Sequence, residues 1–215
     1  MKKLNWGLVG GGKGSQIGDA HRIGAAMDNC FELSAGALDI NPAKGRAYAK
    51  SLGVASDRAY DNWQSMLQGE VGREDGIELV TVATPNATHY EITKAFLDNG
   101  IHVLCEKPLT MTAKEAISLE ALAKKKDRLL AVNFGYTGYP MVRQARAMVR
   151  SGKLGNIRLV SAQFAHGHHS DAADMDNPRV RWRYDPKQAG VSSVLADCGI
   201  PVSYTHLTLP TILRV

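Results

Sequence analysis

Short apolar runs alternate with longer amphipathic segments over the first 135 residues of the chain. Each run is rich in Val, Ile, Leu and Ala, which is typical of strands buried on both faces of a parallel sheet. Because strands that alternate with helices form parallel units with right-handed crossovers, the pattern predicts an α/β fold with a doubly wound parallel sheet. The predicted strands cover residues 4–9, 31–38, 78–83, 101–105 and 129–134, and the predicted helices cover residues 17–27, 42–52, 62–68, 89–98 and 113–125.

The ends of two predicted helices carry residues that suit them. Thr88 and Glu91 have the spacing of a capping box at the start of one helix, and Thr112 and Glu115 have it at the start of the next. Gly100 follows the first of these helices, where a glycine commonly ends a helix because it adopts the left-handed conformation readily. These signals support the predicted boundaries.

The pattern changes after residue 135. A helix is predicted over residues 141–150 and a strand over residues 157–164, and a long polar stretch follows. We therefore expect one domain over residues 1–135 and a boundary near residue 136.

Composition and charge exclude several classes of protein. Apolar residues make up 44% of the chain and charged residues 22%, as in an ordinary globular protein rather than a disordered or fibrous one. Lys and Arg number 26 and Asp and Glu number 21, which gives a net charge of +5, but these residues are scattered. Without a basic stripe or interleaved aromatic residues, we expect no nucleic-acid partner.

The chain carries neither the pattern of a membrane span nor that of a secretion signal. No stretch approaches about 18 consecutive apolar residues, and the apolar run after Lys2 and Lys3 is short and broken by glycines. The three cysteines, Cys30, Cys105 and Cys198, have no metal-ligand spacing. We expect a cytoplasmic protein with buried thiols in a reducing compartment and no membrane partner.

A glycine-rich segment follows the first predicted strand directly, from Gly10 to Gly18. Glycines there let backbone N–H groups approach a pyrophosphate, and the start of the next helix favours its negative charge. Counted from Gly10, the third glycine of the usual G-x-G-x-x-G pattern is replaced by Ser15, whose hydroxyl can donate to a phosphate instead. The segment predicts dinucleotide binding by Gly10, Gly12, Ser15 and Ile17, and the alternative is a turn without a ligand.

An acidic residue, Asp39, lies at the end of the second predicted strand, where dinucleotide-binding domains place the carboxylate that binds a ribose. A carboxylate accepts hydrogen bonds from both ribose hydroxyls and repels a 2′-phosphate, which favours NAD over NADP. Lys44 and Arg46 follow closely, so NADP stays open on grounds of charge. The alternative role for Asp39 is a helix cap, but Asn41 fits that role better.

Two further strand ends carry residues whose side chains are suited to ligand binding or catalysis. The third strand ends in Thr84-Pro85-Asn86, followed by His89, and the fourth ends in Glu106-Lys107-Pro108. Ligands of such sheets bind outside the carboxyl ends of the strands. A lysine at a strand end costs free energy unless it is paired or functional, and desolvation lowers its pKa toward proton transfer. The alternatives are a surface lysine at position 107 and an ordinary helix-start residue at His89.

In this order and spacing, the motifs resemble the Gfo/Idh/MocA family of NAD(P)-dependent oxidoreductases. The resemblance extends through Trp182-Arg183-x-Asp185-Pro186, Ala189-Gly190 and Asp197-x-Gly199, and it covers residues 1 to about 200. The glycine segment, which continues to His21-Arg22, is most similar to the sugar- and polyol-oxidising branch that contains levoglucosan and inositol dehydrogenases. The resemblance implies an N-terminal NAD(P)-binding Rossmann domain over residues 1–135. It also implies the beginning of an α+β substrate domain over residues 136–201, which is incomplete.

The resemblance also implies roles for single residues. In the family, the lysine of Glu-Lys-Pro contacts both the substrate and the nicotinamide ribose, and a cis bond often precedes the proline, so Lys107 and Pro108 inherit these features. Asp197 matches the aspartate that orients the substrate. The histidine that takes the hydroxyl proton would fall at Pro201, and a missing general base costs about 10²- to 10⁴-fold in rate. Cofactor contacts are implied for Thr84, Pro85, Asn86, His89, Glu106 and Lys107.

The implied function is hydride transfer between NAD(P) and a secondary alcohol of a sugar, polyol or cyclitol. Because Pro201 replaces the general base, we expect the chain itself to be an inactive fragment of a dehydrogenase that associates as a homo-oligomer. The alternative is a non-catalytic NAD(P)-binding sensor of the same fold.

Several residues of the second domain are candidates for substrate contact. Lys107, Asp197 and Arg183 follow from the family motifs, and His166 follows a predicted strand that lines the family's pocket. Tyr136 either contacts substrate or packs in the core. His166, His168 and His169 with Asp171 could form a metal site, but hydrogen bonds to sugar hydroxyls fit them better, and we expect no metal.

The last residues, 202–215, depart from the family pattern altogether. The segment from Val202 to Thr211 resembles a translated sequencing-library adapter, so we interpret it as a non-native tail. The alternative is a genuine but divergent C-terminus.

Overall fold

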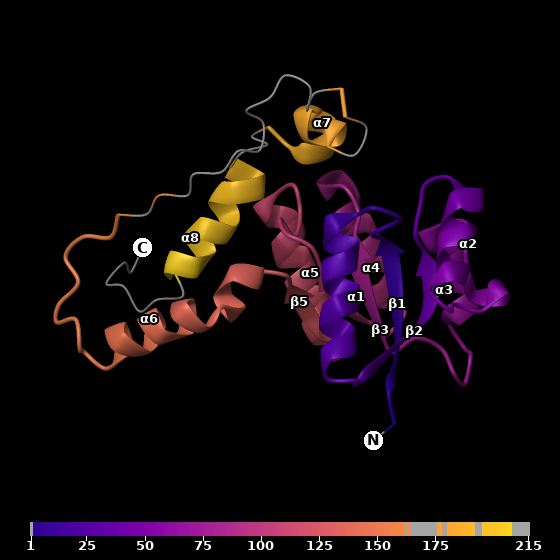
Figure 1. The fold of residues 1–215 in the computed structure, drawn as a ribbon, viewed down its shortest axis with the longest axis horizontal. Coiled ribbons are helices and arrows are strands. Elements are labelled where there is room, and N and C mark those ends of the chain that lie inside the picture. Colours follow the sequence, from indigo (N-terminus) through magenta and orange to yellow (C-terminus); the bar gives the residue numbers. More distant parts are fainter. Residues whose placement is uncertain (1, 162, 164–175, 178–179, 192–194, 208–215) are drawn as a thin grey trace. The chain divides into compact units, whose positions relative to one another are not determined.

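The computed structural model describes residues 2–161, 163, 176–177, 180–191 and 195–207 of the 215-residue chain. It divides into two compact units, Met1–Val132 and Asn133–Val215, which are described separately here (Figure 1).

The first unit is built on a five-stranded parallel sheet with the strand order β2-β1-β3-β4-β5. The chain steps from β1 outward to β2, then returns past β1 and adds the other strands in order, so the predicted doubly wound fold is confirmed. The strands are β1 (Leu4–Gly10), β2 (Phe31–Ala37), β3 (Leu79–Ala83), β4 (His102–Cys105) and β5 (Leu130–Val132). The connecting helices are α1 (Gln16–Met27), α2 (Pro42–Ser51), η1 (Ser56–Arg58), α3 (Trp63–Glu70), η2 (Asn86–Thr88), α4 (His89–Asp98) and α5 (Ala113–Lys126).

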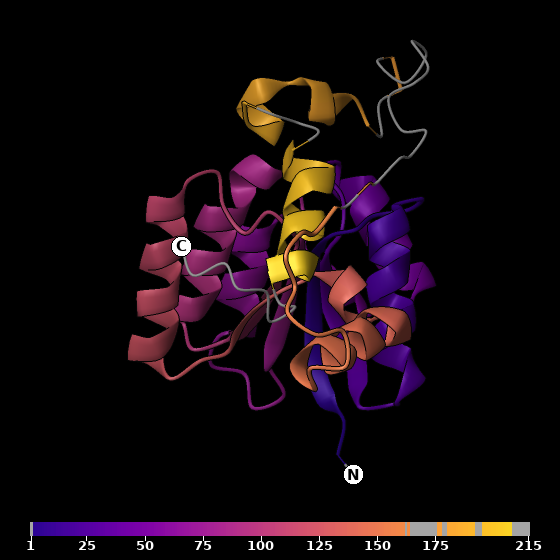
Figure 2. The ribbon, with the colours of Figure 1, turned by 90° about the vertical axis from the view of Figure 1, so that its left-hand side faces the viewer.

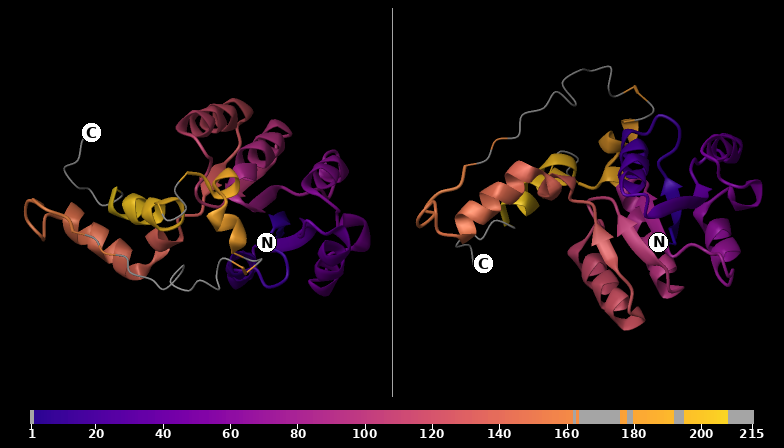
Figure 3. Two further views of the ribbon diagram at one scale, coloured as in Figure 1. Left: turned by 90° about the horizontal axis from the view of Figure 1, so that it is seen from above. Right: turned by 60° about the horizontal axis from the view of Figure 1, so that its bottom comes forward.

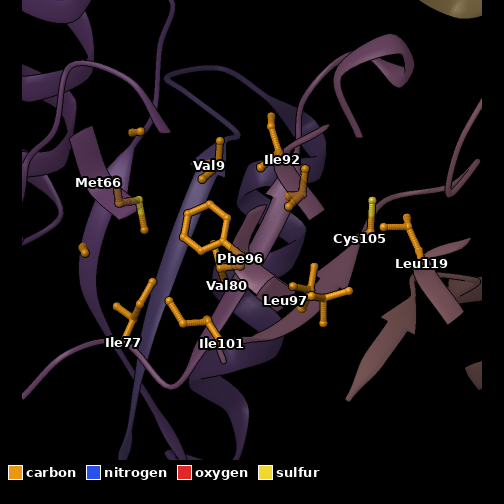
Figure 4. Close-up of a cluster of buried hydrophobic side chains, with 14 of the residues drawn as sticks. Val9, Met66, Ile77, Val80, Ile92, Phe96, Leu97, Ile101, Cys105 and Leu119 are labelled. Carbon is orange, nitrogen blue, oxygen red and sulfur yellow. The ribbon is translucent and has the colours of Figure 1, made fainter. Parts of the chain in front are cut away.

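Helices cover the sheet on both faces. Right-handed crossovers place α1 on one face and α4 and α5 on the other, and Figure 3 shows α1 and α5 on opposite sides of the sheet. The larger core packs Phe96 of α4 and Leu119 of α5, both fully buried, against Val80 and Val103 of the sheet (Figure 4). A second core surrounds Leu8. Alternate residues of each strand therefore point to different helices.

The helix ends confirm one capping box and correct the other. The Thr112 side chain accepts the Glu115 backbone N–H, and the Glu115 side chain accepts that of Thr112. At α4, however, the 3-10 helix η2 leads directly into the α-helix, so Thr88 makes no side-chain cap. Its hydroxyl instead donates to the Pro85 carbonyl at 2.8 Å, a bond that tightens the turn after β3. Gly100 adopts a φ of 79° after α4, as predicted.

A buried ion pair joins η1 to α3. The Arg58 guanidinium donates two hydrogen bonds to the Glu70 carboxylate, one of them from Nε at 3.0 Å. Tyr60 Oη also donates to Glu70, at 2.9 Å, and so does the Ile77 backbone N–H, at 3.1 Å. The Glu70 side chain is fully buried and that of Arg58 is 9% exposed. Burial, together with the Glu70 carboxylate, raises the pKa of Tyr60 to about 12, so its hydroxyl stays protonated.

The second unit contains short helices (Figure 2). They are η3 (Gly135–Gly138), α6 (Pro140–Arg150), η5 (Arg181–Tyr184), α7 (Pro186–Ala189), η6 (Leu195–Gly199) and α8 (Ile200–Leu207). The strand predicted over residues 157–164 is wrong where the structure describes it, because residues 157–161 and 163 form no strand. A strand needs a pairing partner, and the described part of this unit supplies none.

Two other features of the described residues bear on the sequence predictions. No helix there is long and apolar enough to cross a membrane. All three cysteines are free, but only Cys105 is buried, while Cys198 is half-buried and Cys30 is exposed. The prediction of buried thiols is therefore wrong for Cys30, which lies in the turn before β2 and donates to the Asp28 carbonyl.

Candidate active site

Four loops meet at the carboxyl edge of the sheet, because the carboxyl ends of parallel strands share one edge. In the strand order β2-β1-β3-β4 they carry, in turn, Asp39, the glycine segment, Thr84–Asn86 and Glu106–Pro108. Backbone hydrogen bonds join neighbouring loops: the Gly11 N–H donates to Ala83 O at 3.2 Å, and the Glu106 N–H donates to Val82 O at 2.9 Å. The predicted cofactor residues thus lie along one line, and the point where the strand order reverses, between β1 and β3, is at its centre.

The glycine segment caps α1 through Ser15. The Ser15 hydroxyl oxygen accepts the Gly18 N–H at 3.1 Å, and its own hydrogen remains a possible donor. Gly18 lies against Gly11 so closely that a Cβ at Gly18 would stand 2.3 Å from Gly11 O. Gly18 therefore allows the close contact between helix and strand that the third glycine usually provides. Gly18 is not among the predicted site residues, although it directly follows the predicted Ile17 at the start of the helix.

The carboxylate of Asp39 stands beside the glycine segment. A Cβ at Gly12 would lie 2.5 Å from Leu38 O and 3.4 Å from Asp39 Oδ2, so only a glycine lets the loop pass this close. Asp39 Oδ1 accepts the Asn41 N–H at 2.8 Å, while Asn41 itself caps α2 by accepting the Lys44 N–H. The cap and the acid are thus different residues, as predicted.

The basic residues near Asp39, Lys44 and Arg46, are not well placed to bind the 2′-phosphate of NADP. Arg46 forms an ion pair with Asp61, and Lys44 is exposed in the first turn of α2. The pairing of Arg46 lowers the positive potential that NADP would require at this end of the site.

His89 lies between two of the loops rather than facing open space. Its ring is fully buried, with Nδ1 2.7 Å from Pro108 O and Nε2 2.8 Å from Thr84 O. The neighbouring Asn86 is also buried. Since both ring nitrogens face backbone carbonyls, the geometry favours a role in joining the ends of β3 and β4 over the direct cofactor contact expected from the sequence.

His89 makes the stability of the first unit depend on pH. Burial lowers the pKa of His89, while the two carbonyls and the Glu106 carboxylate oppose that shift. The unfolded chain takes up this proton at about pH 6.5 and the folded chain only at lower pH. The contribution of neutral His89 to the free energy of unfolding is therefore fully present above about pH 6.5 and is lost progressively below it. We expect the free energy of unfolding, measured with urea from about pH 8 to about pH 5, to fall on acidification, and a His89→Gln variant to lose part of that dependence. A neutral ring donates to only one of the two carbonyls; stability that rises on acidification would instead mean that the folded ring carries a proton on both nitrogens.

The Glu106–Pro108 turn places a half-buried lysine between two buried residues. Glu106 Oε1 lies 2.7 Å from Nε2 of His21, and the Lys107 backbone N–H donates to Glu106 Oε2 at 3.2 Å. The Lys107–Pro108 peptide bond is cis, as the family resemblance implies. His21, which comes from α1, is absent from our predicted site. It lies three residues after Gly18 in the sequence, but nothing near it there indicates its partner, which is 85 positions away.

The residue before this turn is a buried thiol. Cys105 is fully buried in the larger core, and burial raises its pKa to about 12. It is therefore an inert packing residue at neutral pH.

The second unit brings together three of the predicted substrate residues. Arg183 Nε lies 3.4 Å from Asp197 Oδ2, and both side chains are partly exposed. Burial raises the pKa of Tyr136, and the nearby charges of Tyr139, Cys198 and Asp197 add to that shift. Pro201 is buried in α8.

The predicted substrate residue His166 and the alternative metal ligands at positions 168, 169 and 171 lie outside the described residues. Among the residues that the structure describes, no cluster of His, Cys, Asp or Glu could hold a metal ion.

The fold and the line of loops define a nucleotide-binding oxidoreductase domain of the Rossmann type. The family model described as an oxidoreductase family with an NAD-binding Rossmann fold matches residues 4–134, and the model of the Gfo/Idh/MocA C-terminal domain matches residues 142–203. The chain belongs to the Gfo/Idh/MocA oxidoreductase family, which confirms the resemblance seen in its motifs.

Known relatives agree with this assignment. The uncharacterized oxidoreductase YfiI of Bacillus subtilis is 46% identical over 212 residues, covering 97% of this chain and 54% of that protein. Levoglucosan dehydrogenase of Pseudarthrobacter phenanthrenivorans is 30% identical, covering 92% of this chain and 48% of that protein. The chain thus spans about half the length of the curated relatives it matches.

Two crystal structures of an inositol dehydrogenase homolog from Azotobacter vinelandii are similar to the whole chain. The complex with NAD⁺ has a TM-score of 0.94 at 45% identity and covers 97% of this chain and 54% of that chain. The complex with NADH and myo-inositol has a TM-score of 0.90 at 43% identity and covers 97% and 53%.

Proposed function

We propose that this chain forms the NAD-binding part of a dehydrogenase that moves a hydride between NAD and a secondary alcohol of a sugar, polyol or cyclitol. The observation that carries the proposal is the cradle at Gly12, where the backbone passes beside the Asp39 carboxylate with no room for a Cβ. A dinucleotide with two ribose hydroxyls near a carboxylate fits such a cradle.

Each end of the cofactor has residues to hold it. The glycine segment and the start of α1 would bind the pyrophosphate, and Asp39 would accept hydrogen bonds from the adenosine ribose. Lys107, two strands further along the edge, lies where the nicotinamide half would end. When bound, the nicotinamide supplies the hydride chemistry, which no side chain of the protein can perform.

The substrate hydroxyl would be held by two charged groups. From the family motifs, we expect the Lys107 ammonium to donate a hydrogen bond to it and the Asp197 carboxylate to accept one from it, which would fix its carbon for hydride transfer. Arg183 orients Asp197 through their ion pair, and Tyr136 lines the same part of the second unit. The names of two relatives, a levoglucosan dehydrogenase and an inositol dehydrogenase homolog bound to myo-inositol, support a polyhydroxylated substrate.

Proton transfer from the hydroxyl needs a base, and Pro201 supplies none. A proline side chain has no group that accepts a proton, so we expect this chain to bind NAD without turnover. The same residue favours the second candidate function, an NAD sensor. A histidine at this position in the full gene at the native genomic locus would support the enzyme, and its absence there would support the sensor.

Calorimetric titration of the chain with NAD and NADP tests the proposal. We expect NAD to bind more tightly, and an Asp39→Ser variant to lose about 10- to 100-fold in NAD affinity, since charge-assisted hydrogen bonds are worth about 1.5–3 kcal/mol each. NADP affinity should fall much less, because the variant also removes a repulsion. The control variant Asp57→Ser changes an exposed acid distant from the carboxyl edge and should bind NAD normally. A chain that binds neither nucleotide would refute the proposal.

A further inference from the structure

We infer that His21 is a positioning residue, which holds Glu106 so that the turn after β4 presents Lys107 to the nicotinamide half of NAD. This inference rests on the proposed function, because it concerns how the site distinguishes one half of the cofactor from the other. Sequence motifs alone assigned His21 no role.

The contact between His21 and Glu106 joins a helix to the turn that follows a strand. His21 lies in α1, and its Nε2 stands 2.7 Å from Glu106 Oε1. Successive residues of a strand point to opposite faces, and Cys105 belongs to the core under α4, so Glu106 points to the other face, where α1 lies. The helix that begins at the phosphate-binding segment is thereby tied to the turn that carries the lysine.

Both partners of this contact are withdrawn from water. The side chains of His21 and Glu106 are 8% and 9% exposed. A carboxylate removed from water loses several kcal/mol of solvation unless hydrogen-bond donors replace it. The second oxygen, Oε2, accepts the Lys107 backbone N–H at 3.2 Å. The Glu106 carboxylate therefore links α1 to the backbone of Lys107, with one oxygen on His21 and the other on the Lys107 N–H.

A second histidine holds the turn from the opposite face. His89 in α4 lies 2.7 Å from Pro108 O, one residue after Lys107. The turn is thus fixed immediately before and immediately after the lysine, by groups on both faces of the sheet. Such double support matters because a misplacement of about 1 Å can cost about 10²-fold in a reaction that depends on orientation.

Two amide variants of different length isolate the contact. In His21→Gln the amide N–H can reach the place of Nε2 and donate to Glu106, whereas in His21→Asn the side chain is too short. The two probes are NADH, which occupies the whole site, and ADP, which lacks the nicotinamide and its ribose. We expect His21→Asn to weaken NADH binding by about 10-fold, the equivalent of one hydrogen bond of about 1.4 kcal/mol, with ADP binding changed less than about twofold. His21→Gln should restore most of the NADH affinity.

The outcomes separate this inference from the function on which it rests. Equal losses for NADH and ADP in His21→Asn, or equal NADH affinities in Asn and Gln variants, would overturn the positioning role. If His21→Asn does not fold, His21→Gln decides the matter. A loss of NADH affinity relative to ADP affinity in His21→Gln would overturn the positioning role, and an unchanged ratio of the two affinities would support it. A wild-type chain that does not bind NADH refutes the proposed function, whereas a wild-type chain that binds NADH, together with a His21→Asn variant that binds it equally tightly, refutes the inference alone.

Discussion

Replacing Lys107 by alanine should lower kcat for alcohol-dependent reduction of NAD by about 10²- to 10⁴-fold. The ammonium is placed at the end of β4 by a turn whose flanking residues are both buried, and it is the cationic group at that strand end. Without it, the substrate hydroxyl loses the donor that fixes its orientation and steadies the charge that develops as its proton leaves. The measurement is steady-state turnover of an enzyme that carries residues 1–200 of this chain, the family's histidine in place of Pro201, and the remaining length found in its relatives.

A matched control is Lys125→Ala, which removes an exposed lysine from the last turn of α5 and should leave kcat unchanged. Lys107→Arg keeps the charge but not the shape of the donor, so we expect it to recover only part of the activity. Near-normal turnover of Lys107→Ala would show that the hydroxyl is held by other groups, and the assigned role of Lys107 would then be wrong.

The second large effect is one of stability. We expect Glu70→Ala to reduce the free energy of unfolding by about 3–5 kcal/mol, because it removes the buried carboxylate that pairs with Arg58. The guanidinium then keeps a 3.4 Å contact with the exposed carboxylate of Asp75. The loss also removes the acceptor of the Tyr60 hydroxyl and of the Ile77 N–H. Urea unfolding followed by circular dichroism measures the change.

The control for this variant is Glu120→Ala. Glu120 pairs with Lys124 on the exposed face of α5, where water screens the pair, so its loss should change the free energy of unfolding very little. A double variant, Arg58→Met with Glu70→Leu, should be much less destabilised than Glu70→Ala alone, since no charge is left buried. A Glu70→Ala variant as stable as the Glu120→Ala control would contradict the account of the ion pair.

Local patterns in the sequence were sufficient for much of the fold. The β-branched strand ending at Ala83 and the capping box at Thr112 depend on neighbours a few residues away, and both appear in the structure as expected. The separate roles of Asp39, the acid after the strand, and Asn41, the cap of the next helix, could also be predicted from nearby residues alone. Parallel topology then brought the strand ends to one edge without further information.

Contacts between distant segments could not be predicted in the same way. His21 and Glu106 are 85 positions apart, and neither residue alone indicates the other. The cap at Thr88 failed for a related reason, because the turn from β3 competes for its hydroxyl. The strand expected over residues 157–164 depended on a partner strand that the described residues do not contain.

The shielded sulfur of Cys105 offers a way to follow the strand end in real time. Because its pKa is about 12 and its side chain is shielded from solvent, this thiol reacts only during brief local openings of the structure, whereas the exposed Cys30 is accessible at all times. Slow alkylation, counted by mass after Cys30 and the half-buried Cys198 have been labelled, would therefore report how often β4 opens. Any nucleotide that binds the closed form lengthens the interval between openings, so occupancy becomes measurable as protection, even in a chain that turns nothing over.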